Sequence, residues 1–248
     1  MQPRIQTLDL SKNPLIGQSG GGVPEEFASL VHLKSLRLSE CALSVLPTSI
    51  LTAFTELQSL DLSKNNFTTF FDAEGLKQEH VDWPSLTYIN LNGNALTAVP
   101  YILRYMPNLR QIHLHMNKVA SVNELCREAY SGIDTLDLGQ NKIQEVPTAL
   151  LYYMPNLNQL TLLNNDIQKL PNLLGKHKKL KNIQVDGNPL KTIRRPIIAR
   201  GSQGILAYLA DKYIEGQDDK IEAWAEEQNQ RDKEEVAEYE TRKVEIMR

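Results

Sequence analysis

Residues 133–143 read IDTLDLGQNKI, which is one instance of the pattern LxxLxLxxNxL, with x standing for any residue. The pattern recurs along almost the whole chain, and its first residues lie 28, 24, 29, 23, 24, 24 and 23 positions apart. Self-similarity at a period of roughly 20–50 residues indicates a protein built from stacked structural repeats. Eight repeats are recognised in this way, beginning at Ile5, Leu33, Leu57, Leu86, Leu109, Ile133, Leu157 and Leu180.

The LxL segment of each repeat alternates apolar and polar residues. It predicts a short strand whose leucines point into the core and whose intervening side chains line a concave surface. Where the chain must then turn back, most repeats have an asparagine. A buried asparagine offers donors and an acceptor to backbone groups that the turn leaves unpaired. We therefore expect a ladder of Asn13, Asn65, Asn94, Asn117, Asn141, Asn165 and Asn188, with Cys41 in place of asparagine in the second repeat.

The segments between the strands read LxxLPxxLxxLxxL, and their three-residue apolar spacing favours a helical turn or short helix behind the sheet. We expect Tyr105 and Tyr153, in the near copies RYMPNL and YYMPNL, to pack on that convex side. One repeat alone buries too little apolar surface to offset the entropy of ordering its backbone, so neighbouring repeats must stack. The sequence thus predicts an α/β solenoid shaped as a horseshoe, with parallel strands on its concave face.

Three segments follow from the pattern. Residues 1–193 hold the eight repeats, residues 194–214 form a C-terminal helical cap, and residues 215–248 form a helical tail with 12 acidic against 6 basic side chains. The cap is predicted to be one amphipathic helix that closes the last repeat. Its apolar stripe is Ile197, Ile198, Ile205, Leu206, Tyr208 and Leu209.

Regularity breaks at three places. The first repeat carries the extra stretch IGQSGGGVP at 16–24 and the third carries DAEGLKQEHVDW at 72–83. Insertions in a solenoid form loops, which serve either as spacers or as recognition elements. The first repeat also begins at Ile5 without a helix to cover its apolar edge, so we expect a longer natural chain or a partner that covers the edge.

The repeats resemble the intracellular class of leucine-rich repeat proteins. From about residue 86 to residue 213 the chain is also similar to the C-terminal end of the leucine-rich repeat-containing protein 40 family, which ends in an Asn-Pro repeat and a helical cap. The matching cap residues are Ile197, Ile198, Arg200, Gly201, Ser202, Ile205, Leu206, Tyr208 and Leu209. The resemblance implies an intracellular, non-enzymatic binding scaffold and identifies no ligand. The tail after Lys212 departs from the family pattern.

Composition excludes several classes of protein. The formal net charge is −3, and no stretch approaches the ~20 apolar residues of a membrane span. The two cysteines, Cys41 and Cys126, cannot build a disulfide framework and form no zinc-ligand motif. Phosphate-binding, HExxH and GxSxG motifs are absent from the sequence, so we expect no cofactor, no metal and no enzyme. A reducing compartment fits best, and we expect a cytoplasmic location, with the nucleus still open.

The candidate partner-binding residues lie on outward positions of the middle repeats. Aromatic, histidine and apolar side chains gather there, where earlier repeats carry small or charged ones. Such groups on a rigid surface are candidate binding hot spots, although an ordinary solvated strand surface is the alternative. We call the following set the central concave patch: Tyr88, Asn90, Asn92, His113, His115, Met116, Asp137 and Leu163.

Two further readings concern charge. His113 and His115 share one face beside Asp137, so the three could bind zinc or sense pH, but two such histidines are more often simply exposed. Basic residues crowd the last two repeats opposite only Asp186, and would suit nucleic acid, an acidic protein or the chain's own acidic tail. They are Lys176, Lys178, Lys179, Lys181, Lys191, Arg194, Arg195 and Arg200.

The sequence therefore predicts a non-enzymatic intracellular scaffold that binds another protein through its concave strand face. Small-molecule substrates and membrane insertion are not expected, and nucleic acid is a weaker candidate partner. The alternative is a structural subunit of a larger assembly, held through the C-terminal tail and the uncapped first repeat.

Overall fold

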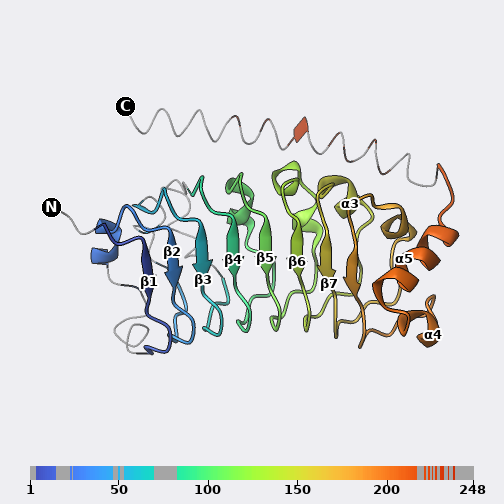
Figure 1. Cartoon of the computed structure of the whole chain (residues 1–248), viewed down its shortest axis with the longest axis horizontal. Helices are drawn as coiled ribbons and strands as arrows, with labels where there is room; N and C mark the ends of the chain where they lie inside the picture. Colours follow the sequence, from blue (N-terminus) through green and yellow to red (C-terminus); the bar gives the residue numbers. More distant parts are fainter. Residues whose placement is uncertain are drawn as a thin grey trace.

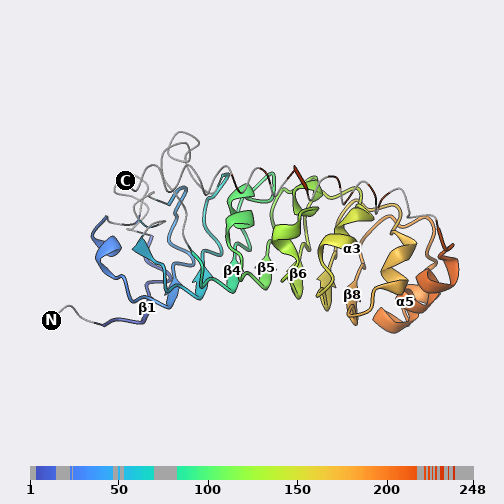
Figure 2. The ribbon, with the colours of Figure 1, turned by 90° about the horizontal axis from the view of Figure 1, so that it is seen from above.

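A computed structural model describes residues 4–14, 23, 25–46, 50, 53–69 and 83–216, and the tail positions 221, 223, 225, 227, 230, 231, 234 and 237. Its centre is an eight-stranded parallel sheet whose strands follow sequence order. The strands are β1 (Thr7–Asp9), β2 (Ser35–Arg37), β3 (Ser59–Asp61), β4 (Tyr88–Asn90), β5 (Gln111–His113), β6 (Thr135–Asp137), β7 (Gln159–Thr161) and β8 (Asn182–Gln184). They stand in one open row (Figure 1) that curves with the strands along its concave edge (Figure 2), which confirms the predicted solenoid of parallel strands.

The strand register follows from the alternation of side chains. The middle residue of each strand is leucine or isoleucine and pairs with the middle residue of the next, as Leu136 does with Leu160. A slip by one residue would turn these side chains to the solvent face, so core burial fixes the register. One outward column consequently crosses the whole sheet: Asp9, Arg37, Asp61, Asn90, His113, Asp137, Thr161 and Gln184.

The return segments lie on the side of the sheet away from the concave edge (Figure 2). Tyr153 is buried there at 2% exposure, as its place in the repeat predicts, and Tyr105 is half-buried against the core. The short turns are mostly 3-10 helices, because each return segment is too short for a long helix. They are η1 (Glu25–Ser29), η3 (Tyr101–Tyr105), η4 (Asn123–Leu125), η5 (Glu128–Tyr130) and η6 (Asn172–Lys176), with the α-helix α3 (Ala149–Tyr153).

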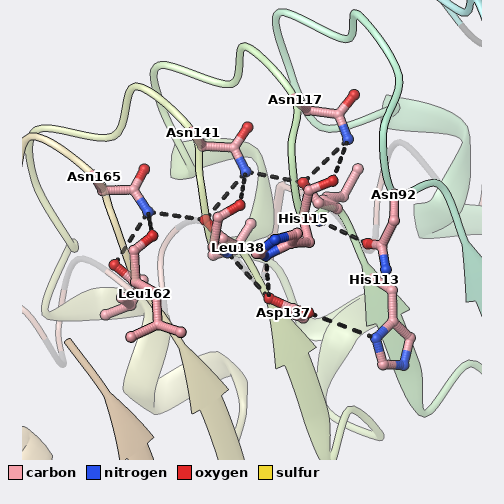
Figure 3. A network of polar contacts seen from close by, with 12 residues as sticks. Asn92, His113, His115, Asn117, Asp137, Leu138, Asn141, Leu162 and Asn165 are labelled. Atoms are coloured by element: carbon pink, nitrogen blue, oxygen red, sulfur yellow. Dashed lines mark hydrogen bonds and ion pairs between the residues drawn. The ribbon is translucent and has the colours of Figure 1, made fainter. Parts of the chain in front are cut away.

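The predicted asparagine ladder is present (Figure 3). The side-chain nitrogen of Asn141 donates to the carbonyl oxygen of Leu138 in its own repeat at 3.1 Å and to that of Leu114 in the previous repeat at 2.9 Å. Its side-chain oxygen accepts the backbone N–H of Val119 at 2.9 Å. Asn165 also donates to Leu138, so each of these carbonyls is held by two successive asparagines. The ladder therefore satisfies the turns and joins neighbouring repeats.

The ladder is weaker at its first two rungs. Asn13 is exposed, and among the described residues its side chain donates to Leu10 and Ser11 of its own repeat alone. Cys41 is fully buried, and its Sγ–H donates to the Leu10 carbonyl at 3.1 Å. A thiol has one weak donor where asparagine has two donors and an acceptor, so the first repeat is tied to the second less firmly than later neighbours are to each other.

The C-terminal cap consists of two helices, α4 (Arg195–Ile198) and α5 (Gly201–Lys212), where the sequence predicted one. Ala199 and Arg200 separate them, and Gly201 begins α5 with φ of +68°, a left-handed conformation that glycine adopts without a steric penalty. Ile205 and Leu209 of α5 are buried against the last repeat, and the remaining residues of the predicted stripe pack partly buried beside them.

The cap also completes the edge of the sheet. The Ser202 hydroxyl accepts the backbone N–H of Ile183 at 3.0 Å and donates to its carbonyl oxygen at 2.9 Å. Because Ile183 is the middle residue of β8, one serine supplies the partner that a ninth strand would provide. On the other side α5 lies so close to η6 that a Cβ at Gly175 would overlap the backbone of Ala210.

From residue 221 onward the described positions of the tail are helical, and two of them pack against the repeats. Ala225 is buried at 5% exposure, and Ile221 is partly buried against the core. The Tyr153 hydroxyl donates to the Ala225 carbonyl oxygen at 2.7 Å, which joins α3 to a residue 72 positions further along the chain. Ala223, Glu227, Gln230, Arg231, Glu234 and Ala237 are exposed.

Both long insertions fall almost entirely outside the described residues. Of the segments 16–24 and 72–83, only Val23 and Trp83 are described, and both are buried in the core. Their roles as spacer or recognition loop therefore stay predictions.

His177 links the last repeat to its neighbour and makes stability depend on pH. Its Nδ1 accepts the Leu180 backbone N–H at 3.1 Å, and its Nε2–H donates to the Met154 carbonyl oxygen at 3.0 Å. Burial lowers the pKa of His177 below its ordinary value, against the opposing effect of the Met154 hydrogen bond and with a smaller contribution from Lys179. The folded chain thus binds a proton at this site less readily than the unfolded chain does.

The free energy of unfolding should therefore fall as the pH is lowered through about 6.5, the ordinary pKa of histidine, and on towards the lower pKa that His177 has in the folded chain. The reason is that the unfolded state takes up the proton first. Urea unfolding at several pH values between about 7.5 and 5, a range that includes the ordinary pKa of histidine, measures how steeply the free energy of unfolding depends on pH. In His177→Gln the slope should be shallower. An unchanged slope in this variant would contradict the assignment to His177.

Candidate partner-binding site

Strands β4, β5 and β6 bring most of the central concave patch together. Asn90, His113 and Asp137 are register partners on these strands, and Tyr88 lies two residues before Asn90 on the same face. Asn92 and His115 follow the ends of their strands on that same side. Their backbones are fixed by the sheet and the ladder, so these side chains are held in place before any partner arrives.

Two predicted members lie apart from this group. Met116 follows His115 in a left-handed turn with φ of +56°, and its side chain is 54% exposed beyond the end of the strand. Leu163 is partly buried and lies beyond Gly139, which has no side chain to connect it to His115. The structure therefore gathers six of the eight predicted residues and leaves these two at the margin.

Asp137 lies between the two histidines (Figure 3). Its Oδ1 is 3.7 Å from Nδ1 of His115, and its Oδ2 is 4.0 Å from Nδ1 of His113. Asp137 Oδ1 also accepts the Gly139 backbone N–H at 3.0 Å, which fixes the carboxylate. Among the described residues no group of three or more histidine, cysteine or acidic side chains is arranged to hold a metal ion.

Gly139 gives His115 the room to approach Asp137. A Cβ at this position would lie 2.5 Å from Nδ1 of His115. Sequence reasoning missed this role, because a glycine at an outward position contributes no side chain to the concave surface. The sequence feature that could have indicated it is that Gly139 is the one glycine among the outward positions, next to the two histidines.

The ring of Tyr88 packs beside that of His113, with 5.2 Å between the ring centroids and 45° between the ring planes. Burial lowers the pKa of His113, although Asp137 and Asp61 act in the opposite direction. Burial also raises the pKa of Tyr88, and the Asp61 carboxylate adds to that increase. The pair is therefore a neutral, partly buried aromatic surface near neutral pH.

Asn90 and Asn92 are partly committed to the backbone. Asn90 Oδ1 accepts the Asn92 N–H at 3.0 Å, and Asn92 Oδ1 accepts the His115 N–H at 2.7 Å. Both side chains thus hold the loops after β4 and β5.

The sequence also missed a polar hollow of about 440 Å³ on the concave face of β1 to β4. In it, Arg37 Nη1 is 3.7 Å from Asp9 Oδ2. Asp61 Oδ1 accepts the Ser63 backbone N–H at 2.9 Å. The hollow borders the central concave patch through Tyr88, and its lining is Asp9, Ser11, Arg37, Ser39, Ser59, Asp61 and Tyr88.

The basic residues predicted for the last two repeats are all exposed, and so is Asp186. A second hollow, of about 480 Å³, lies between η6 and α5 and includes Lys181 and Gln203 in its lining. Cys41 and Cys126 are free and buried, and burial raises the pKa of the Cys126 thiol to about 12. A thiol with so high a pKa is protonated at neutral pH and is a poor nucleophile. No helix in the described part of the chain is both long and apolar enough to cross a membrane.

Comparison with known proteins gives consistent matches. Models of the leucine-rich repeat family match residues 4–30, 56–76 and 131–190. Mouse leucine-rich repeats and immunoglobulin-like domains protein 2 is 30% identical over 140 residues, which cover 54% of this chain and 12% of that protein. The chain thus spans a small part of the length of this relative.

Solved structures show the same fold. A leucine-rich repeat protein of Leptospira interrogans superimposes with a TM-score of 0.58 and 25% identity, over 84% of this chain and 54% of that one. The plant peptide hormone receptor RGFR1, solved in complex with RGF2, superimposes with a TM-score of 0.53 and 25% identity, over 68% of this chain and 26% of that one. Repeat spacing, asparagine ladder, open parallel sheet and these matches agree that the chain has the leucine-rich repeat fold.

Proposed function

We propose that the chain is a non-enzymatic scaffold that binds another protein through its concave face, with the central concave patch at the centre of the interface. The observation that carries the proposal is the packing of Tyr88, His113 and Asp137 on three adjacent strands. A partner would meet an aromatic pair and a carboxylate already held in place, so little conformational entropy is lost on binding. Leucine-rich repeats generally mediate protein–protein interaction, which supports the same function.

We also propose that the chain acts inside the cell, in the cytoplasm or nucleus. Two free, buried cysteines support a reducing compartment. The resemblance of residues 86–213 to the leucine-rich repeat-containing protein 40 family supports it as well.

Triple replacement of Tyr88, His113 and Leu163 by glutamate should abolish capture of the partner, because it removes the Tyr88–His113 ring pair and the neighbouring apolar side chain from the centre of the surface. Crosslinking followed by affinity purification from the native cell measures capture, with the unaltered chain as reference. Deletion of 215–248 is the matched comparison and should leave capture intact. Circular dichroism establishes that both variants keep the fold.

The alternative, a structural subunit held through the tail, predicts the opposite pair of results. Its supporting observation is the exposed side of the tail helix, which carries the Glu227–Arg231 ion pair and Glu234, while Ala225 on the other side is anchored to Tyr153. Loss of capture on deletion of 215–248, with capture by the triple variant intact, would favour this alternative and exclude the concave site. Normal capture by both variants would exclude both placements.

A further inference from the structure

The concave face carries more negative than positive charge. Its outward columns hold four carboxylates, Asp9, Asp61, Asp137 and Asp186, and one permanent cation, Arg37. Arg37 lies 3.7 Å from Asp9, so these two charges largely offset each other. Asp61 has no cation within ion-pair distance among the described residues, and its defined partner is the Ser63 N–H.

The carboxylate of Asp61 lies beside an aromatic ring. Asp61 and Tyr88 both line the 440 Å³ hollow, and the Asp61 charge is close enough to raise the pKa of Tyr88. On the far side of the Tyr88–His113 pair lies Asp137, 4.0 Å from His113 Nδ1. Two aromatic rings are therefore flanked by a carboxylate on each side, next to open space.

This combination has a specific chemical complement. A guanidinium group stacks on an aromatic face and forms paired hydrogen bonds with a carboxylate. A phosphate or an acidic side chain would be repelled by the same carboxylates. The hollow of 440 Å³ has space for one long side chain and its ordered waters.

We propose that the hollow beside Tyr88 binds an arginine side chain of an extended, basic segment of the protein partner. Asp61 accepts the guanidinium hydrogen bonds, the Tyr88 ring stacks on the guanidinium plane, and Asp137 attracts the next basic residue of the segment. This proposal rests on the scaffold function and specifies the chemistry of its partner.

The test is fluorescence anisotropy of the full chain with a labelled peptide of Gly-Ser-Arg repeats whose ends are blocked and uncharged, at about 0.15 M salt. A Gly-Ser-Lys peptide should bind several-fold more weakly, because lysine lacks the planar group that stacks. A Gly-Ser-Glu peptide should not bind. Asp61→Asn and Tyr88→Leu should each weaken binding of the arginine peptide about tenfold, as expected for the loss of one desolvated, charge-assisted contact.

Two variants serve as controls. Asp186→Asn removes the same charge from the same face at the β8 end, so it should leave the affinity within about twofold, because salt screens charges at that separation. Tyr88→Phe keeps the aromatic ring and should also stay within about twofold. Unfolding midpoints equal to that of the unaltered chain establish that Asp61→Asn and Tyr88→Leu are folded.

Three results would overturn the proposal. If Asp186→Asn weakens binding as much as Asp61→Asn, the peptide is held by general charge attraction alone. If no concave variant matters, the peptide binds elsewhere, such as on the acidic tail. If the arginine peptide fails to bind while the glutamate triple variant still loses its partner, the scaffold function stands and the basic-segment proposal is wrong.

Discussion

Replacement of Asn141 by leucine is expected to lower the free energy of unfolding by about 2–4 kcal/mol. Leucine has the same branched arrangement of side-chain heavy atoms and is somewhat larger, so the loss comes from hydrogen bonding and not from a cavity. The buried N–H of Val119 loses its acceptor altogether, whereas the carbonyls of Leu114 and Leu138 each keep a second asparagine donor. Asn141 also donates to the Gly139 carbonyl oxygen, which keeps the Met116 N–H, so the penalty is one unpaired buried donor plus three weakened acceptors. Urea unfolding with the slope and midpoint fitted separately measures it.

Asn13→Leu is the matched control for this substitution. Asn13 is exposed, and within the part of the chain that the structure describes its side chain bonds to its own repeat alone, so its loss should cost less than about 1 kcal/mol. Equal losses at Asn13 and Asn141 would show that the bonds between repeats add nothing, and the account of the ladder given above would then be wrong.

Replacement of Gly175 by alanine is expected to cost about 3–5 kcal/mol, because one methyl group must displace a helix. The new Cβ would overlap the Ala210 backbone and lie 2.6 Å from the Leu206 carbonyl oxygen. No rotamer change relieves a clash with backbone, so α5 must move away and expose Ile205 and Leu209. Each of these side chains contributes roughly 1.5–3 kcal/mol by its burial.

Hydrogen exchange localises this effect, because amides of α5 and β8 should lose protection first while β4 to β6 keep theirs. The neighbouring substitution Lys176→Ala, at an exposed position of the same 3-10 helix, should change stability by no more than about 0.5 kcal/mol. If Gly175→Ala unfolds like the unaltered chain, α5 is not packed on η6 as described.

The repeats were predictable because each one contacts its immediate neighbours in the same way. Leucines such as Leu136 and Leu160 had to share one face, and that parity alone fixed the strand register. The asparagine ladder followed from the same logic, since a turn that leaves backbone groups unpaired needs a compact donor and acceptor.

Features that depend on contacts between different elements were not predictable in this way. The division of the cap into α4 and α5 was missed although Gly201 marks it, because an apolar stripe can continue across a break in the backbone. The steric roles of Gly139 and Gly175 arise from side chains or helices in other segments. The hollow beside Tyr88 depends on the side-chain conformation that places Arg37 near Asp9. The spacing of residues along the chain does not specify that conformation.

The bond from Tyr153 to Ala225 has a consequence for how the chain unfolds. Ladder bonds such as that from Asn141 to Leu114 join residues 27 positions apart, whereas this one closes a loop of 72 positions around β7, β8 and the cap. A solenoid with neighbour contacts alone can unravel one coil at a time. Here the bond from Tyr153 to Ala225 links the carboxyl-terminal repeats and the cap to one another. They should melt as a single cooperative block and re-form slowly, since the long loop must close first.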